Sequence, residues 1–175
     1  LSSSAMLLAG TSLRANPSES VPRQLVGKIA KQTLWRNRSG RATTWFHPRA
    51  CMVPGQGAHP TALMTMQSIG GSDYFGPVHF TESTDQGKSW SAPQRLPALG
   101  RVDVENHPGL EAGVCDVVPQ YHAPTKSVLA LGHVVFYRGP RFSRNDQLAR
   151  FPVYSVRNPE GEWSPRKKLQ WTDPR

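Results

Sequence analysis

The stretch Ser83-Thr84-Asp85-Gln86-Gly87-Lys88-Ser89-Trp90 carries more structural information than the rest of this 175-residue sequence. Asp85 supplies a side-chain acceptor for nearby backbone N–H groups, and Gly87 tolerates the positive φ of a tight turn. Residues 77–82 have the β-branched and aromatic content of a strand, and residues 91–93 close a short second one. The stretch therefore predicts a tight turn between two strands.

The composition extends this prediction to the whole chain. Only 37% of the residues are hydrophobic, and 16 prolines and 15 glycines interrupt the sequence every few residues. This spacing suits short strands and turns and leaves little room for long helices. The sequence predicts an all-β fold, and no apolar run after the first residues approaches the length of a membrane span.

The formal net charge is +9 and the isoelectric point is near 10.2, which raises the question of a polyanionic partner. The basic residues are scattered, with dense pieces only at 36–41 and 166–168. No aromatic-interleaved RNA motif or zinc spacing accompanies them, so we expect no nucleic-acid partner. The open alternatives are a solvated basic surface and a substrate that carries a carboxylate.

The N-terminal residues resemble the later part of a secretory signal peptide. Residues 1–15 have a short apolar centre followed by small residues. We expect residues 1–30 to be this remnant plus a polar connector, and the protein to be secreted or periplasmic.

Two similar units follow, at about residues 45–97 and 113–171. Each contains several β-like runs of the kind expected for a four-stranded propeller blade. The second unit ends in a weaker copy of the turn at residues 83–90. This copy keeps Ser155, Gly161 and Trp163 but lacks the aspartate. Residues 31–175 are therefore predicted to form about two blades.

The turn at residues 83–90 matches an Asp-box, and with it the chain resembles the sialidase (neuraminidase) superfamily, especially secreted bacterial members with neuraminidase repeats. The resemblance spans about residues 35–171. It implies a six-bladed β-propeller, of which this chain is the N-terminal part, and a structural role at the blade rim for four residues: Ser83, Asp85, Gly87 and Trp90.

The resemblance also implies two substrate-contacting residues. Arg49 stands where the family has the first arginine of a cluster that binds the substrate carboxylate, although Ala50 and Cys51 replace the family's Ile-Pro. Asp73, in a glycine-flanked loop, stands in the window of the family's general acid. The alternatives are an ordinary surface arginine and a turn-forming aspartate.

Asp116 and His133 are further candidates for the substrate site, because inner-strand residues of a propeller surround its ligand site. The alternative for each is a structural polar group. His47, His79, His107 and Glu111 show no metal-ligand spacing, and we predict neither a metal nor another cofactor.

Cys51 and Cys115 recur about one repeat apart. Neighbouring blades of an exported protein could bring them together as a disulfide. Two small buried thiols are the alternative.

These expectations define the predicted function. The resemblance implies a glycoside hydrolase that removes terminal sialic or other acidic sugars from glycans, with its nucleophile in later blades and little activity in this chain alone. The alternatives are a non-catalytic propeller that binds glycan or protein, and a glycosidase or lyase of other specificity.

Overall fold

The computed structural model describes residues 26–37, 40, 44–55, 57, 59–71, 73–142 and 144–172. The chain divides into two compact units, Leu1–Gln32 and Thr33–Arg175. The segment predicted to be a signal-peptide remnant, residues 1–15, lies outside the described residues. All of the strands belong to the second unit.

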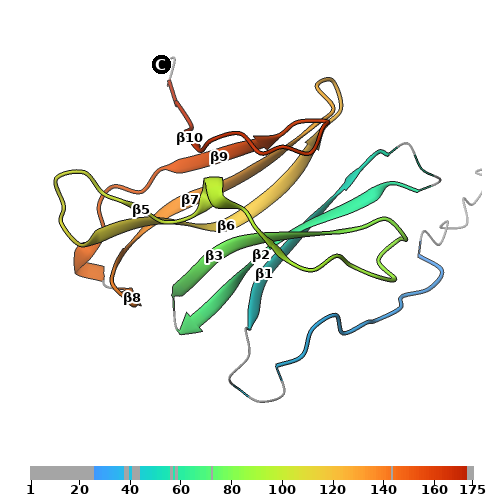
Figure 1. Ribbon diagram of the computed structural model, residues 1–175, viewed down its shortest axis with the longest axis horizontal. Helices are drawn as coiled ribbons and strands as arrows, with labels where there is room; N and C mark the ends of the chain where they lie inside the picture. The colour runs from blue at the N-terminus through green and yellow to red at the C-terminus, as the bar shows by residue number, and fades with distance from the viewer. Residues whose placement is uncertain are drawn as a thin grey trace, which may run out of the picture. The chain divides into compact units, whose positions relative to one another are not determined.

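The first sheet is a four-stranded antiparallel meander in which each strand pairs with the next one along the chain (Figure 1). Its strands are β1 (Trp45–Val53), β2 (Thr61–Gly71), β3 (Tyr74–Ser83) and β4 (Gln94–Arg95). The innermost strand, β1, borders the second sheet, and the short β4 lies at the opposite edge.

The second sheet repeats this plan with two short additions. Its four main strands, in the order β6-β7-β9-β10, are β6 (Leu110–His122), β7 (Ser127–Arg138), β9 (Pro152–Arg157) and β10 (Lys167–Lys168). The additions are β5 (Val102–Asp103), which pairs with β6, and β8 (Arg141–Phe142), which pairs with β7. Neighbouring strands are again antiparallel.

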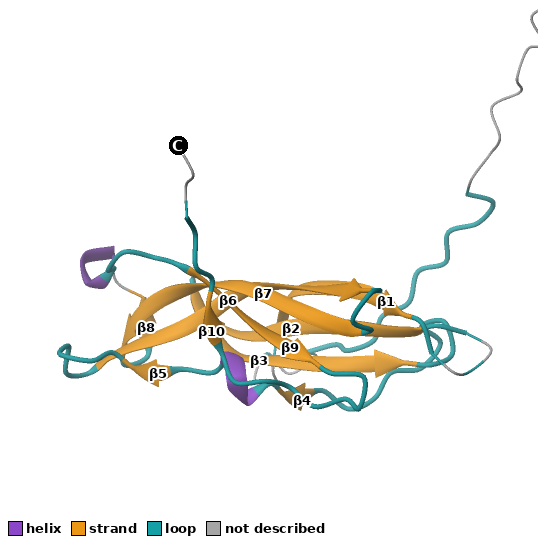
Figure 2. Cartoon of the chain, turned by 90° about the horizontal axis from the view of Figure 1, so that it is seen from above, coloured by secondary structure: helices purple, strands orange, loops and turns teal. Residues whose placement is uncertain are grey.

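Helical structure in the described part of the chain is limited to two single 3-10 turns, η1 (Pro97–Leu99) and η2 (Arg144–Asp146) (Figure 2). Among the described residues no helix has the length and apolar character that crossing a membrane requires. The predicted all-β fold is confirmed, and the two meanders are compatible with two consecutive blades of a propeller.

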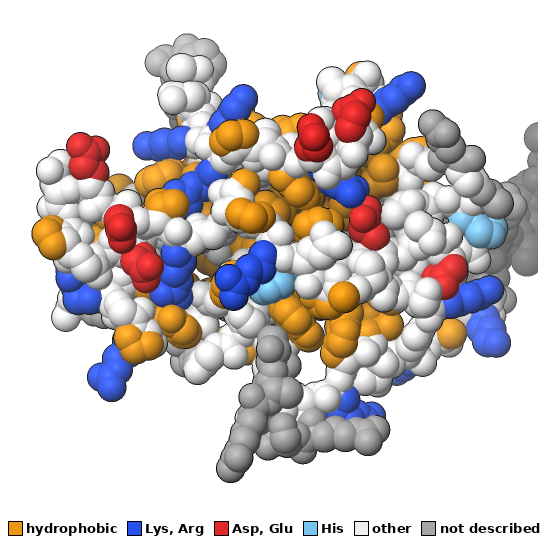
Figure 3. Space-filling view, viewed as in Figure 1, with side chains coloured by type: hydrophobic (Ala, Val, Ile, Leu, Met, Phe, Trp, Pro, Cys, Tyr) orange, Lys and Arg blue, Asp and Glu red, His pale blue; other side chains and the backbone are white. Residues whose placement is uncertain are grey.

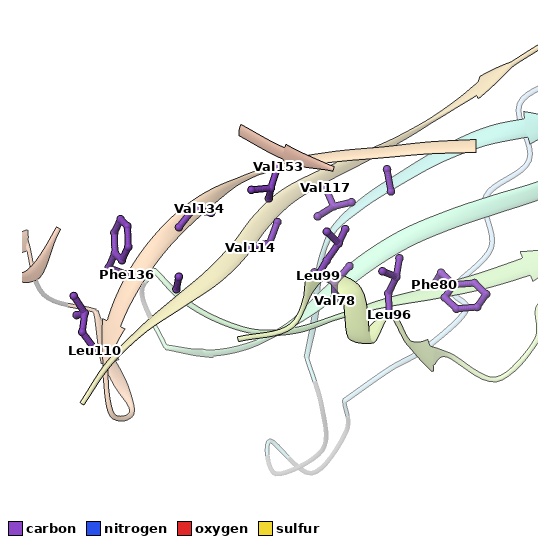
Figure 4. Packing of buried hydrophobic residues seen from close by; sticks show 12 residues of the cluster. Val78, Phe80, Leu96, Leu99, Leu110, Val114, Val117, Val134, Phe136 and Val153 are labelled. Carbon is purple, nitrogen blue, oxygen red and sulfur yellow. The ribbon is translucent and has the colours of Figure 1, made fainter. Parts of the chain in front are cut away.

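The hydrophobic core lies between the two sheets (Figure 4). β3 contributes Val78 and Phe80, and η1 with the residue before it contributes Leu96 and Leu99. The second sheet contributes Leu110, Ala112, Val114, Val117, Ala130, Val134, Phe136 and Val153. The alternation of side chains along each strand directs one apolar set toward the facing sheet. Burial of this shared face is what holds the sheets together.

Two buried polar side chains of β2 also join the sheets. Thr65 Oγ1 donates a hydrogen bond to the carbonyl of Val117 (2.7 Å), and Gln67 Nε2 donates to the carbonyl of Val114 (2.8 Å). Thr65 is 0% exposed and Gln67 is 1% exposed. Both carbonyls belong to β6, so these bonds fix how far β6 can slide along β2.

The turn between β3 and β4 has the geometry that its sequence predicts. Asp85 Oδ1 accepts from the Ser83 hydroxyl (2.8 Å) and from the Ser89 N–H (2.9 Å), while Oδ2 accepts from the Ser89 hydroxyl (2.6 Å). Gly87 has φ of +85° and donates its N–H to Ser83 Oγ (2.8 Å). The Trp90 ring N–H closes the turn on the carbonyl of Gly87 (3.2 Å).

A pair of hydroxyl hydrogen bonds at the base of this turn, which we call the serine clamp, recurs in the second sheet. The Thr81 hydroxyl donates to the carbonyl of Ser91 (2.7 Å), and the Ser155 hydroxyl donates to the carbonyl of Ser164 (2.6 Å). In both sheets the hydroxyl oxygen of the later serine accepts a hydrogen bond from a strand N–H, that of Glu82 or Val156, at 3.0 Å. The weaker copy of the turn therefore keeps the backbone frame, although it lacks the aspartate.

We predict that the pKa of Asp85 is about 2, lowered from its usual 3.8 chiefly by the hydrogen bonds from Ser89 and Ser83. A lowered pKa means that folding favours the ionised carboxylate, so the resulting stabilisation is present above pH of about 4 and is lost as the pH falls through about 2. A carboxyl-carbon NMR titration measures the pKa directly. Ser89→Ala should raise it, and an unchanged pKa in that variant would contradict the assignment.

Candidate functional site

A hollow of about 730 Å³ opens where β1 meets β6. Its described lining comes from β1, the β2–β3 turn, β3, β6, β7, β8 and the segment after β8: Phe46, His47, Asp73, Phe75, Cys115, Asp116, His133, Val135, Phe142, Arg144, Gln147 and Arg150. We call this feature the inner-strand hollow. It combines acids, imidazoles and guanidinium groups with an aromatic wall.

Matching β-bulges shape the hollow from both sides. The register of β1 shifts between Phe46 and Arg49, and that of β6 shifts between Cys115 and Val118. His47 and Asp116 therefore occupy equivalent positions in the two inner strands. In a regular strand, successive side chains point to opposite faces of the sheet. A bulge changes this alternation, so neighbouring residues of one strand can face the same hollow.

Three residues of the lining have strained backbone conformations. His47, Asp73 and Asp116 have φ of 49°, 57° and 53°, which is the left-handed region that non-glycine residues rarely adopt. Each such residue costs on the order of 1–3 kcal/mol, so the surrounding structure must hold it there. Strained residues cluster at ligand sites more often than elsewhere, and here three of them border one hollow.

Gly132 allows the β6 bulge to lie close to β7. A Cβ at this position would come within 2.8 Å of the carbonyl oxygen of Cys115 and 2.7 Å of Val114 Cγ1. The Cys115 carbonyl belongs to the backbone and could not move without displacing the strand, so a side chain at this position would push β6 and β7 apart. The close approach brings Cys115 opposite His133, its cross-strand partner.

The hollow brings together a thiol, a carboxylate and two imidazoles. Cys115 Sγ lies 3.3 Å from His133 Nε2, and Asp116 Oδ1 lies 2.6 Å from His47 Nδ1. Burial, followed by the nearby charge of Asp116, raises the pKa of the Cys115 thiol to about 12. Without a bound cation this thiol keeps its proton at neutral pH, and it is therefore a poor nucleophile.

The two arginines of the hollow come from the segment that follows β8. Gln147 fixes this segment by accepting the Phe136 N–H at 3.2 Å and donating its own side-chain N–H to the Phe136 carbonyl at 2.7 Å. Arg144 and Arg150 flank this anchor and are exposed at the mouth of the hollow. Their guanidinium groups are suited to binding a carboxylate.

The structure brings three of the four predicted substrate-site residues together. Asp73, Asp116 and His133 all line the hollow, although 60 residues separate the first from the last. Arg49 does not line it; its side chain is exposed and donates to the neighbouring carbonyl of Pro48 at 3.1 Å. A role for Arg49 in carboxylate binding stays a prediction.

Sequence reasoning missed several residues of the hollow: His47, Cys115, Arg144 and Arg150. The two arginines had no specific signal, since neighbouring Arg138 and Arg141 are of the same type and do not line the hollow. His47 had no signal in the sequence either, because its contact with Asp116 depends on two β-bulges that no local sequence pattern predicts. The same holds for the contact between Cys115 and His133.

The possible disulfide between Cys51 and Cys115 is absent, since both thiols are free. The equivalent bulges align Cys51 with Gln120, and the Cys51 thiol indeed contacts the backbone of Tyr121. At about 3.3 Å per residue, Tyr121 is roughly 20 Å along β6 from Cys115. A disulfide needs Cα atoms within about 7 Å, so the two repeats place the cysteines out of reach.

The charged side chains are mixed with other types on one face of the molecule. On the face drawn in Figure 3, lysine and arginine side chains lie among hydrophobic and acidic ones instead of forming one basic field. This distribution fits a solvated, mildly basic surface.

Comparison of the chain with protein-family models, with curated proteins and with solved structures finds no match. The fold and the contents of the hollow are therefore the basis for a functional assignment.

Proposed function

We propose that this chain is part of a sialidase-like β-propeller, an exported glycoside hydrolase that acts on terminal acidic sugars. The observation that carries the proposal is the composition of the inner-strand hollow. It combines Asp73 with two arginines, Arg144 and Arg150, and an aromatic wall whose Phe46 and Phe75 rings are 6.0 Å apart. The Asp-box turn and the two four-stranded meanders support the propeller part of the proposal.

Each group has a chemical role in this proposal. The guanidinium groups bind the carboxylate of the sugar through charge-assisted hydrogen bonds. The aromatic rings pack against the apolar face of the sugar ring. Asp73 donates a proton to the leaving oxygen of the glycosidic bond. Further blades would supply the nucleophile, because propellers close with about four to eight blades.

Binding of N-acetylneuraminic acid tests the arginine role. We expect Arg150→Ala to weaken binding by about 10-fold or more, because a hydrogen bond between charged groups contributes about 1.5–3 kcal/mol. Arg141→Ala is the matched control, since Arg141 is exposed in β8 and does not line the hollow. Isothermal titration calorimetry measures both variants. Equal affinity for a neutral sugar such as galactose would contradict the proposal.

Turnover of a fluorogenic sialoside by the protein with a complete ring of blades tests the role of Asp73. Asp73→Asn should retain binding and lose most of the turnover, because the amide cannot act as the acid. Asparagine adopts left-handed φ as readily as aspartate, so this change does not add strain at φ of 57°. Full turnover by the variant would rule out Asp73 as the proton donor.

A non-catalytic propeller that binds acidic glycans is the second candidate. One observation favours it: the guanidinium groups and the stacked Phe46 and Phe75 rings of the hollow are sufficient to bind an acidic sugar without any reaction. Sialic-acid binding that depends on Arg150, without turnover by the complete ring, would select this function.

A further inference from the structure

We propose that Cys115, Asp116 and His133 bind a divalent transition-metal cation of the zinc class. This inference does not depend on the proposed carbohydrate chemistry. It is based on the mutual position of three ligand-type side chains, on the backbone that holds them, and on the side chain that contacts one of them from the neighbouring sheet.

The ligand atoms already have nearly the spacing of a metal site. The Cys115 thiol, an Asp116 carboxylate oxygen and a His133 ring nitrogen all lie within 4.8 Å of one another, and the sulfur is 3.3 Å from His133 Nε2. Zinc–ligand bonds of about 2.0–2.3 Å in a tetrahedron place ligand atoms about 3.3–3.8 Å apart. Small side-chain rotations therefore complete the site.

The donor types select the class of cation. Sulfur and imidazole nitrogen favour zinc, cobalt or a similar borderline metal, whereas magnesium and calcium prefer oxygen ligands. Three protein ligands leave one tetrahedral position for a water molecule or a ligand atom. That position faces the inner-strand hollow, because all three residues line it.

The backbone provides an independent argument. Cys115 and Asp116 are consecutive residues of β6, and in a regular strand their side chains would point to opposite faces of the sheet. The bulge between Cys115 and Val118, with Asp116 at φ of 53°, turns both toward His133. Gly132 provides the room for this close approach. The strain at Asp116 thus assembles a ligand set that no regular strand could present.

His47 supports the site from the first sheet. Its buried Nδ1 lies 2.6 Å from Asp116 Oδ1, at the distance of an ion pair but without the geometry of a hydrogen bond. Carboxylates that bind metals are commonly held by such an outer contact, and losing it typically weakens metal binding by 10- to 100-fold. We therefore assign His47 as a positioning residue of the metal site.

Titration of the tag-free protein with Co²⁺ and Zn²⁺ tests the proposal. We expect saturable binding of one Co²⁺ per chain, with the near-ultraviolet absorption of a thiolate-to-cobalt charge transfer, and displacement by Zn²⁺. Cys115→Ser should abolish this absorption. Cys51→Ser is the matched control and should retain it, because Cys51 is the other free thiol and contacts β6 at Tyr121, six residues from Cys115.

Two further variants keep the test valid if Cys115→Ser fails to fold. Asp116→Asn and His47→Asn both tolerate a left-handed backbone, and each should weaken Co²⁺ binding by about 10-fold or more while leaving the circular dichroism spectrum unchanged. A folded wild-type protein that binds neither metal at micromolar concentration would overturn the proposal, as would absorption that depends on Cys51. Sialic-acid affinity, measured with and without Zn²⁺, tests the carbohydrate proposal separately.

Discussion

Replacing Leu99 with alanine is expected to lower the free energy of unfolding by about 2–5 kcal/mol. Leu99 ends the η1 turn, is 1% exposed, and belongs to the cluster between the two sheets. The substitution removes apolar contacts and leaves a cavity that the facing strands cannot fill without moving. Chemical denaturation followed by tryptophan fluorescence measures the change.

The matched control is Leu148→Ala, because Leu148 is 37% exposed and outside the core cluster. A change within about 0.5 kcal/mol is expected there. If Leu99→Ala unfolded at the same denaturant concentration as the wild type, the two sheets would not share a packed core at η1.

Arg101→Met is expected to cost about 2–4 kcal/mol of unfolding free energy, because it removes a cation from several partners at once. The guanidinium carbon lies 4.0 Å from the centre of the Tyr137 ring and 4.5 Å from that of Tyr74. Its nitrogens donate to the Phe75 carbonyl (2.9 Å) and to Glu111 (3.3 Å). Methionine keeps most of the apolar volume of the arginine side chain. The decrease in the free energy of unfolding therefore measures the lost hydrogen bonds and cation–π contacts.

Two further variants show which property of Arg101 accounts for the lost stability. Arg101→Lys keeps the charge but not the planar fork, and should recover only part of the stability. Arg141→Met, at an exposed position of β8, should change the free energy of unfolding by about 0.5 kcal/mol or less. Full stability of Arg101→Lys would show that the charge alone is sufficient and that the stacked geometry contributes nothing.

Arg101 also shows how the core and the hollow are connected. It follows η1 and reaches across to Tyr137 of β7 and to the carbonyl of Phe75, whose ring lines the hollow. Loss of Arg101 is therefore expected to loosen the aromatic wall as well as the packing of the sheets. Stability and ligand affinity should decline together in this variant.

The features that the sequence determined by itself are local. The turn at residues 83–90 could be predicted because the acceptors of Asp85 and their donors lie within four residues of each other. The all-β class followed from the spacing of proline and glycine and from the β-branched runs. The weaker second turn was visible through Ser155, Gly161 and Trp163, although its serine clamp was not.

The site was only partly predictable. Asp73, Asp116 and His133 were identified as candidates, but nothing in the sequence placed them in one hollow with Arg144 and Arg150. Of the two alternatives for Cys51 and Cys115, the structure has free thiols and no disulfide, because the two cysteines do not occupy equivalent positions of β1 and β6. The true alignment is set by the bulges at residues 46–49 and 115–118, which shift the equivalence of the two inner strands.

Only the tertiary structure decided which distant side chains meet. The contact between His47 and Asp116 needs two bulged strands in different sheets, and the contact between Cys115 and His133 needs the register of β6 on β7. The register of paired strands is set by burial of the whole apolar face. Many residues contribute to that face, so no single residue predicts the register. The sequence therefore determined the turns and the strands, whereas packing of the two sheets decided the chemistry of the hollow between them.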